Sequence, residues 1–197
     1  MTQIRKVYLG GPEVFLPDAL AVVTQKATLC TQYGFEAAIP SDNGGNHSSD
    51  WSHYTPTQIA RAIYQANVDT MKSVDFGIFD LTPFRGVSAD AGTIFEVGLM
   101  VGMGKPVFGY TNIAGDYIDR FGVKQAAPDA NPMIAWVDDR GWRIENFGGA
   151  DNLMIDSAIA LNGADMVRMS APLPDLFHYM EAFKGALGEA KAYFTAK

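Results

Sequence analysis

Two carboxylates lie close together in the stretch SADAGTIFEVG, at Asp90 and Glu96. From Gly92 to Gly104 nearly every residue is apolar, which predicts a helix that is buried on almost all sides. An ionised carboxylate in such surroundings is costly unless a partner or a hydrogen bond compensates for the lost water. Glu96, in the first turns of this helix, therefore needs a specific partner and is a candidate for chemistry.

The position of Glu96 near a helix N-terminus favours a role as a nucleophile. The helix dipole stabilises the ionised carboxylate while burial opposes it, and the balance leaves a desolvated anion. The hydroxyl of Tyr8 is a candidate to orient this anion. Asp90, in the loop before the helix, would share the pocket in a different environment. Such a pair suits glycosyl transfer with retention, in which one carboxylate attacks the anomeric carbon and the other protonates the leaving group. A simpler interpretation stays open, in which Asp90 only caps the helix and Glu96 only makes a structural ion pair.

The elements that must position these residues alternate between short apolar runs and helical patterns. This alternation predicts an α/β fold, a doubly wound parallel sheet with helices on both faces. Buried strands are predicted at 6–11, 35–39, 75–81 and 106–110, helices at 17–33, 55–73 and 151–161, a hairpin at 136–142, and a C-terminal helix with Leu176, Met180, Phe183, Leu187 and Ala190 on one face.

Ligands bind at the carboxyl ends of the strands in sheets of this kind, and the unusual residues gather there. Gly10 follows the first strand in the stretch YLGGP, and Asp80 opens the stretch DLTPFRGVSAD, so both are candidate substrate-binding residues. Asn67 interrupts the apolar face of the helix at 55–73. A buried amide must be hydrogen-bonded, so Asn67 either bonds the backbone of a nearby loop or contacts the polar edge of a ligand.

Composition limits the class of protein. The 197 residues fit one domain over 1–197, and 48% hydrophobic with 19% charged residues is an ordinary globular composition. A net charge of −7 and the lack of a basic stripe argue against nucleic acid as a partner. The N-terminus has no run typical of a signal peptide, and Glu96 and Lys105 interrupt the longest apolar region, so no membrane contact is expected. A small-molecule ligand is the favoured partner.

The remaining features point to a cytoplasmic protein. The one cysteine, Cys30, falls on a helical stripe with Leu20, Val23 and Ala27, which predicts a buried structural thiol rather than a nucleophile. The NHS sequon at Asn46 is then accidental. The polar stretch from residue 40 to 56 is long for a loop and is expected to be a lid or locally mobile.

Several segments together resemble the nucleoside 2-deoxyribosyltransferase family. The resemblance extends to about Met154 and rests on VYLGGPEVF, DFGIFDLTPFRGVSADAGTIFEVG, GKPVFGY and IENFGGADNLM, with the spaced Asp-x-Gly-Thr-x-x-Glu-x-Gly block as its most specific part. It implies a flavodoxin-like fold and the exchange of the base on a 2′-deoxyribonucleoside through a covalent deoxyribosyl-enzyme, as in nucleotide salvage. The glycines of GLMVGMG lie inside a helix, so they do not form a dinucleotide-binding motif.

The resemblance also implies roles for single residues. Glu96 matches the nucleophile, Tyr8 the phenol that positions it, Asp90 the acid that protonates the departing base, and Phe15 the aromatic ring against that base. Asn67 stands where better-known members have an aspartate facing the base, so the base preference stays open. Asn152, with Met154 beside it, matches the residue that a neighbouring subunit places at the 5′-hydroxyl. The expected partners are therefore a deoxynucleoside, a free nucleobase and further copies of the chain in a homo-oligomer with shared active sites, with no metal and no cofactor.

Three other functions stay open. Water in place of the second base would make the enzyme a hydrolase, and a deoxynucleoside 5′-monophosphate glycosidase would need an anion site, for which Ser88 and Arg85 are candidates. Arg85 equally suits a role in anchoring its loop. A noncatalytic nucleotide-sensing module is favoured only if Glu96 is inaccessible. A flavin-binding protein is disfavoured because no phosphate-cradling loop rich in Ser and Thr follows the first strand.

Overall fold

A five-stranded parallel sheet forms the centre of the molecule in a computed structural model that describes residues 4–38, 51–126 and 131–196. The strands lie in the order β2-β1-β3-β4-β8, and all pair in parallel. This is the flavodoxin-like order, so the predicted fold class is confirmed. The sheet consists of β1 (Arg5–Gly10), β2 (Phe35–Ala38), β3 (Phe76–Asp80), β4 (Val107–Thr111) and β8 (Val167–Arg168).

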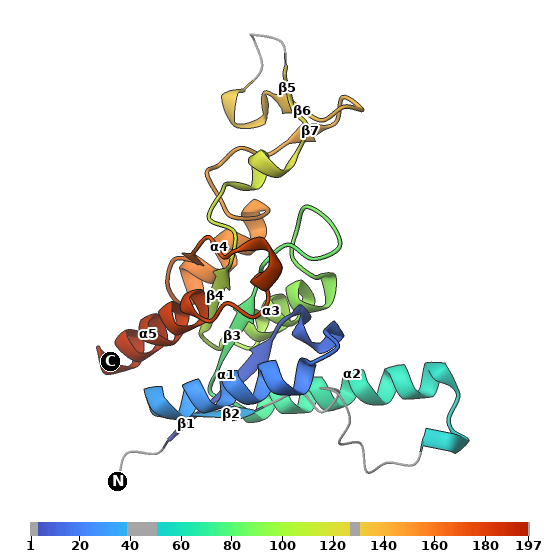
Figure 1. The fold of residues 1–197 in the computed structure, drawn as a ribbon, viewed down its shortest axis with the longest axis vertical. Helices are drawn as coiled ribbons and strands as arrows, with labels where there is room; N and C mark the ends of the chain where they lie inside the picture. The colour runs from blue at the N-terminus through green and yellow to red at the C-terminus, as the bar shows by residue number, and fades with distance from the viewer. Residues whose placement is uncertain (1–3, 39–50, 127–130, 197) are drawn as a thin grey trace.

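Helices cover both faces of the sheet (Figure 1). On one face, α1 (Ala19–Tyr33) and α5 (Glu181–Thr195) enclose a core with Val7, Ile78 and Phe108. On the other face, α2 (Pro56–Ser73), α3 (Ala91–Gly102) and α4 (Leu153–Asn162) enclose a second core with Tyr8 and Phe79. Successive strand residues point to opposite faces, so each strand supplies both cores.

The helix boundaries follow from capping residues that the sequence already displays. Thr55 and Gln58 form a reciprocal capping box at the start of α2, with Pro56 in the first turn. Gly34 ends α1 in the left-handed conformation, with a φ of +91°, which side chains other than glycine rarely adopt.

A second, three-stranded antiparallel sheet stands away from the central layers, at the top of Figure 1. Its strands are β5 (Lys124–Gln125), β6 (Trp136–Val137) and β7 (Arg143–Ile144), and the pairing of β6 with β7 confirms the predicted hairpin. Short 3-10 helices connect the larger elements: η1 (Pro12–Phe15), η2 (Trp51–His53), η3 (Tyr117–Arg120), η4 (Pro132–Ile134) and η5 (Leu173–Asp175).

Two expectations about burial are corrected. The helix α3 is not buried on all sides, because Phe95 is 51% exposed and several other positions on that face are small residues with little apolar area to bury. On α1, the buried stripe contains Val22, Lys26 and Cys30, whereas Leu20 is 63% exposed. Cys30 itself is fully buried as expected, and burial raises the pKa of its thiol to about 12.

Some boundaries also differ from the prediction. The C-terminal helix begins at Glu181, so Leu176 lies before it. The strands β5 and β8 have two residues each, too few for a periodic pattern to show. The predicted lid falls mostly on 39–50, outside the described residues, as does Asn46.

Candidate active site

The carboxylate of Glu96 meets the hydroxyl of Tyr8 at the carboxyl ends of the central strands. The Tyr8 hydroxyl donates a hydrogen bond to Glu96 Oε1 over 2.7 Å, across 88 positions of sequence. Tyr8 is fully buried on β1, so its ring has a fixed position, and Glu96 lies in the second turn of α3. A buried phenol that donates to a carboxylate stabilises the ionised form and orients it.

Glycine at position 10 makes room for this carboxylate. A Cβ atom built on Gly10 would lie 2.8 Å from Glu96 Oε2 and 2.6 Å from the ring of Phe79. Such contacts are too short for carbon, so the backbone of β1 can approach Glu96 only because residue 10 has no side chain.

Asp90 serves as the N-cap of α3. Its Oδ2 accepts hydrogen bonds from the backbone N–H and the hydroxyl of Thr93, at 3.0 and 3.3 Å. The capping function considered at the level of sequence is therefore present. The same carboxylate also lines the pocket that contains Glu96, so capping fixes it at a place where a ligand would reach it.

The pocket around Glu96 is a cavity of about 160 Å³ that opens to solvent. Asn67 lies in its wall, and Asn67 Oδ1 is buried without a hydrogen-bond partner among the described residues. Because a buried amide oxygen without a partner is unfavourable, this atom favours the reading of Asn67 as a ligand contact. The lining residues are Leu9, Gly10, Gly11, Val14, Phe15, Asn67, Asp90, Gly92, Thr93 and Glu96.

Phe15 supplies an aromatic wall to this pocket and is 51% exposed. Its ring stacks on Phe84, with the ring centres 5.3 Å apart and the planes 12° from parallel. The guanidinium of Arg85 lies over both rings, at 4.7 Å from Phe15 and 4.6 Å from Phe84. This cation–π contact supports the reading of Arg85 as a residue that anchors its loop.

Asp80 does not line the pocket, contrary to the expectation that it contacts substrate. Its side chain is 1% exposed and turns to the opposite face of the sheet, where Tyr110 donates to Asp80 Oδ2 over 3.0 Å. Lys26 Nζ lies 3.8 Å from the same oxygen. Burial raises the pKa of the Asp80 carboxyl, and the charge of Lys26 opposes that shift.

Ser88, Asn152 and Met154 also lie outside the Glu96 pocket of their own chain. The hydroxyl of Ser88 donates to Asp151, a buried carboxylate that also lies 3.7 Å from the guanidinium of Arg120. Asn152 is the N-cap of α4 and donates to Glu145 over 2.9 Å. Met154 is 70% exposed. The prediction for Asn152 and Met154 concerns the pocket of a neighbouring subunit, and it stays a prediction.

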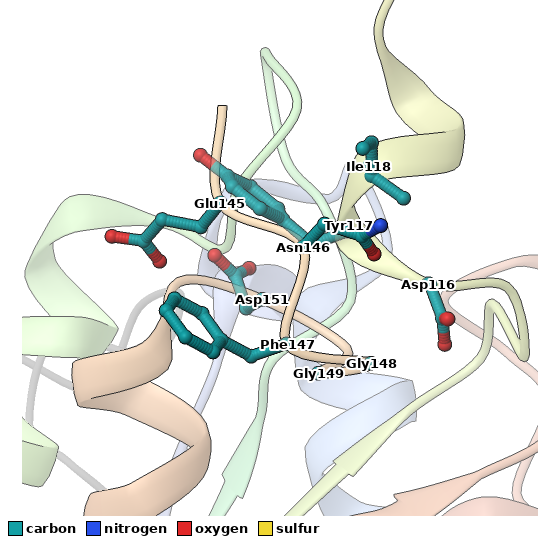
Figure 2. A pocket seen from close by; sticks show the side chains of 9 residues that line it. All are labelled: Asp116, Tyr117, Ile118, Glu145, Asn146, Phe147, Gly148, Gly149 and Asp151. Carbon is teal, nitrogen blue, oxygen red and sulfur yellow. The ribbon is translucent and has the colours of Figure 1, made fainter. Parts of the chain in front are cut away.

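A second hollow lies where the small sheet joins the rest of the chain. Figure 2 shows its lining side chains, which come from residues 116–118 and 145–151. Its cavity of about 10 Å³ has room for about one water molecule, and its lining includes the carboxylates of Asp116, Glu145 and Asp151. It is therefore too small for a substrate. Among the described residues, no cluster of side chains could hold a metal ion, and no helix could cross a membrane.

Sequence reasoning missed several pocket residues: Leu9, Gly11, Val14, Gly92 and Thr93. Each lies within three residues of a predicted site residue. Only its position in the sequence, and not its residue type, could have indicated a place in the pocket. The pair Glu13 and Lys26, buried beside the pocket, was also missed.

Comparisons with known proteins assign the chain to a family. The family model for nucleoside 2-deoxyribosyltransferase matches residues 7–154, so the chain belongs to that family. The chain is similar to the 2-desoxiribosyltransferase from Leishmania mexicana, with 26% identity, a TM-score of 0.61, and coverage of 89% of this chain and 96% of that one. It is also 29% identical to the uncharacterised protein C191.05c of Schizosaccharomyces pombe, over 97% of this chain and 90% of that protein.

Proposed function

We propose that the protein transfers 2-deoxyribose between nucleobases, with Glu96 as the nucleophile, Tyr8 as the residue that orients it and Asp90 as the acid. The hydrogen bond of 2.7 Å from Tyr8 to Glu96, at the edge of a pocket that Asp90 also lines, carries this proposal. Family membership supports the same class of reaction.

In the first step, a Glu96 oxygen forms a bond to the anomeric carbon of a 2′-deoxyribonucleoside. The bond from that carbon to the base nitrogen breaks, and the electron pair leaves with the base, which takes a proton from Asp90. The transition state resembles an oxocarbenium ion, and the missing 2′-hydroxyl makes it easier to reach. In the second step, a nitrogen of another base attacks the same carbon, the ester bond breaks with its electron pair going to the Glu96 oxygen, and Asp90 takes the proton that the incoming nitrogen loses. Two inversions give net retention.

The side chains around the pocket suit a nucleobase as the leaving group. Phe15 offers a flat ring against a base, and Asn67 Oδ1 offers an acceptor without a protein partner among the described residues. Water in place of the second base would give hydrolysis, so the balance of transfer and hydrolysis depends on how well the second base fills the pocket.

We also propose a homo-oligomer with shared active sites. The cavity of about 160 Å³ is smaller than the roughly 300–1,000 Å³ of typical ligand pockets, so a further wall would complete it. Phe95 and Tyr64 form an exposed aromatic pair on α3 and α2, at 51% and 53% exposure, and Met154 is also exposed. A second copy would cover such apolar side chains.

The test mixes the protein with one deoxynucleoside and a different free base and follows both products by chromatography. Intact-protein mass spectrometry after an acid quench detects the deoxyribosyl-enzyme on the way. The proposal requires a new nucleoside and a protein adduct that Glu96→Gln does not form. A protein that binds the nucleoside but forms neither would instead be a noncatalytic nucleotide-binding module.

A further inference from the structure

A buried cluster of three charged side chains lies beside the pocket and has no part in the proposed chemistry. Glu13, Lys26 and Asp80 are each 2% exposed or less. Lys26 Nζ donates to Glu13 Oε1 over 2.5 Å and lies 3.8 Å from Asp80 Oδ2. The rings of Tyr110 and Phe183 lie within 5.5 Å of the same ammonium. The cluster is thus enclosed, and Lys26 is its centre.

Glu13 connects this cluster to the lip of the pocket, which we define as residues 11–15. Its chain neighbours Gly11, Val14 and Phe15 line the pocket, whereas the Glu13 side chain turns inward to Lys26. A Cβ on Gly11 would lie 2.1 Å from Glu13 Oε2, so the lip packs directly on the buried carboxylate. The bond from Lys26 therefore holds the lip from its inner side.

Asp80 connects the same ammonium to the segment 82–90, which ends at Asp90. Asp80 Oδ1 accepts the backbone N–H of Thr82 over 2.9 Å, at the start of that segment. Burial raises the pKa of the Asp80 carboxyl, and the charge of Lys26 opposes that shift, so the lysine interacts with Asp80 as well as with Glu13. One lysine is therefore linked to the lip through Glu13 and to the segment 82–90 through Asp80.

A buried ion pair of this kind adds little to stability compared with apolar residues of similar size, since desolvation offsets the attraction. The hydrogen-bonded ion pair does, in contrast, require a defined distance and direction between Lys26 and Glu13, so it fixes the relative positions of the segments that carry them. We propose that Lys26 is a positioning residue that holds the lip 11–15 and the segment 82–90 in register around the ligand. This inference rests on the proposed function, because it assigns the lip to the base-binding side of the reaction.

The test replaces the pair by apolar side chains of similar size, in the double variant Glu13→Leu/Lys26→Met. The melting temperature is expected to fall by several degrees, because the buried Asp80 carboxyl loses the lysine 3.8 Å away. The fold should be kept, because Asp80 still accepts hydrogen bonds from Thr82 and Tyr110. Hydrogen–deuterium exchange is expected to rise in 11–16 and 82–90 while α2 and α5 keep their protection. The KM for the incoming base should rise at least about tenfold, because Phe15 lies in the lip. The change in kcat should be smaller, because Asp90 is also held as the N-cap of α3, and Glu96 and Tyr8 lie on the other face of the sheet.

Two further variants bracket this result. Lys6→Met removes an exposed lysine, 3.3 Å from Glu36, and should change neither exchange nor kinetics. Glu13→Gln leaves Lys26 beside Asp80, so this variant is expected to fold, with faster hydrogen exchange in 11–16 and little change in 82–90.

Unchanged hydrogen exchange in both loops together with an unchanged KM for the base would overturn the proposal, and Glu13→Gln decides the matter if the double variant does not fold. A wild-type protein without base exchange would contradict the proposed function, yet the hydrogen-exchange comparison would still decide whether Lys26 positions the two loops. The two failures are therefore distinguishable.

Discussion

At the scale of single residues, the proposed role of Glu96 as the nucleophile can be tested by replacing one oxygen atom of its side chain. Glu96→Gln keeps the shape of the side chain and an acceptor for the Tyr8 hydroxyl but lacks the anionic oxygen. Base exchange is expected to fall by roughly 10⁴-fold or more, with an unchanged circular dichroism spectrum. Glu36→Gln, in an exposed ion pair with Lys6, is the matched control. Near-normal turnover of Glu96→Gln would remove Glu96 from the role of nucleophile.

Asp90 has two roles to separate, the cap of α3 and the acid. Asp90→Asn keeps an oxygen for the N–H of Thr93, and Asn is as good an N-cap as Asp, so stability should be nearly unchanged. Turnover of nucleosides with poor leaving bases should fall by about 10²- to 10⁴-fold, whereas an activated nucleoside whose leaving group needs no proton should be affected much less. Steady-state kinetics on both substrates measure the difference. Equal losses would assign Asp90 to structure alone.

Gly10 is required by close approach rather than by backbone conformation. Gly10→Ala would place a Cβ 2.8 Å from Glu96 Oε2, and the carboxylate or the strand must shift. Since a displacement of about 1 Å can cost about 10²-fold in rate, kcat/KM should fall by a similar factor. Gly188→Ala, in the helix α5 with open space around it, is the control and should leave the rate unchanged. A Gly10→Ala enzyme with wild-type kinetics would show that Glu96 tolerates the shift.

At the scale of elements, the burial of Cys30 couples the stability of α1 to pH. The folded-state pKa of about 12 lies above the ordinary value of 9.0, so the buried thiol stabilises the fold below pH 9. That contribution is lost as the pH rises from 9 towards 12, because the unfolded chain releases the proton first. Urea unfolding should show a loss of about 1.4 kcal/mol per pH unit in this range that Cys30→Ala lacks. Identical slopes for both proteins would contradict the assignment.

Periodicity was a good guide to elements and a weaker guide to their surroundings. The alternation of apolar runs and helical patterns predicted four of the five strands of the central sheet, because each of these has at least four residues. It did not predict the exposed side of α3, because an apolar residue such as Phe95 does not show by its type whether another element packs against it. Asp80 shows a signal that was present but unused. It follows Phe79 on β3, and with a period of two it must face away from the core that contains Phe79 and Tyr8. Lys26 likewise stands on the helical stripe of Val22 and Cys30.

At the scale of the whole molecule, the proposed sharing of active sites depends on where each chain holds Asn152. The residues that gather in one chain lie at the end of β1, in or next to η1, on α2, and on α3 with its N-cap Asp90. Asn152 is held elsewhere, as the cap of α4 with its amide on Glu145, so its position is fixed but its own pocket is not beside it. Because Asn152 is held in a fixed position outside the pocket of its own chain, it is suited to contact a ligand in the pocket of a second copy.

Subunit mixing tests this sharing. Glu96→Ala and Asn152→Ala are each expected to have little activity as pure proteins. After dissociation and reassociation, a mixed dimer contains one site with an intact Glu96 from one chain and an intact Asn152 from the other. Random pairing should restore about a quarter of the wild-type activity.

The control mixes Glu96→Ala with Asn162→Ala. Asn162 lies at the opposite end of α4, where its amide donates to the Ala158 carbonyl, so the Asn162→Ala variant should be fully active before mixing. If mixed oligomers form, as native mass spectrometry can show, yet no activity returns, Asn152 does not act across the interface, because only an Asn152 that crosses it can complete the site of the Asn152→Ala chain, which keeps its Glu96.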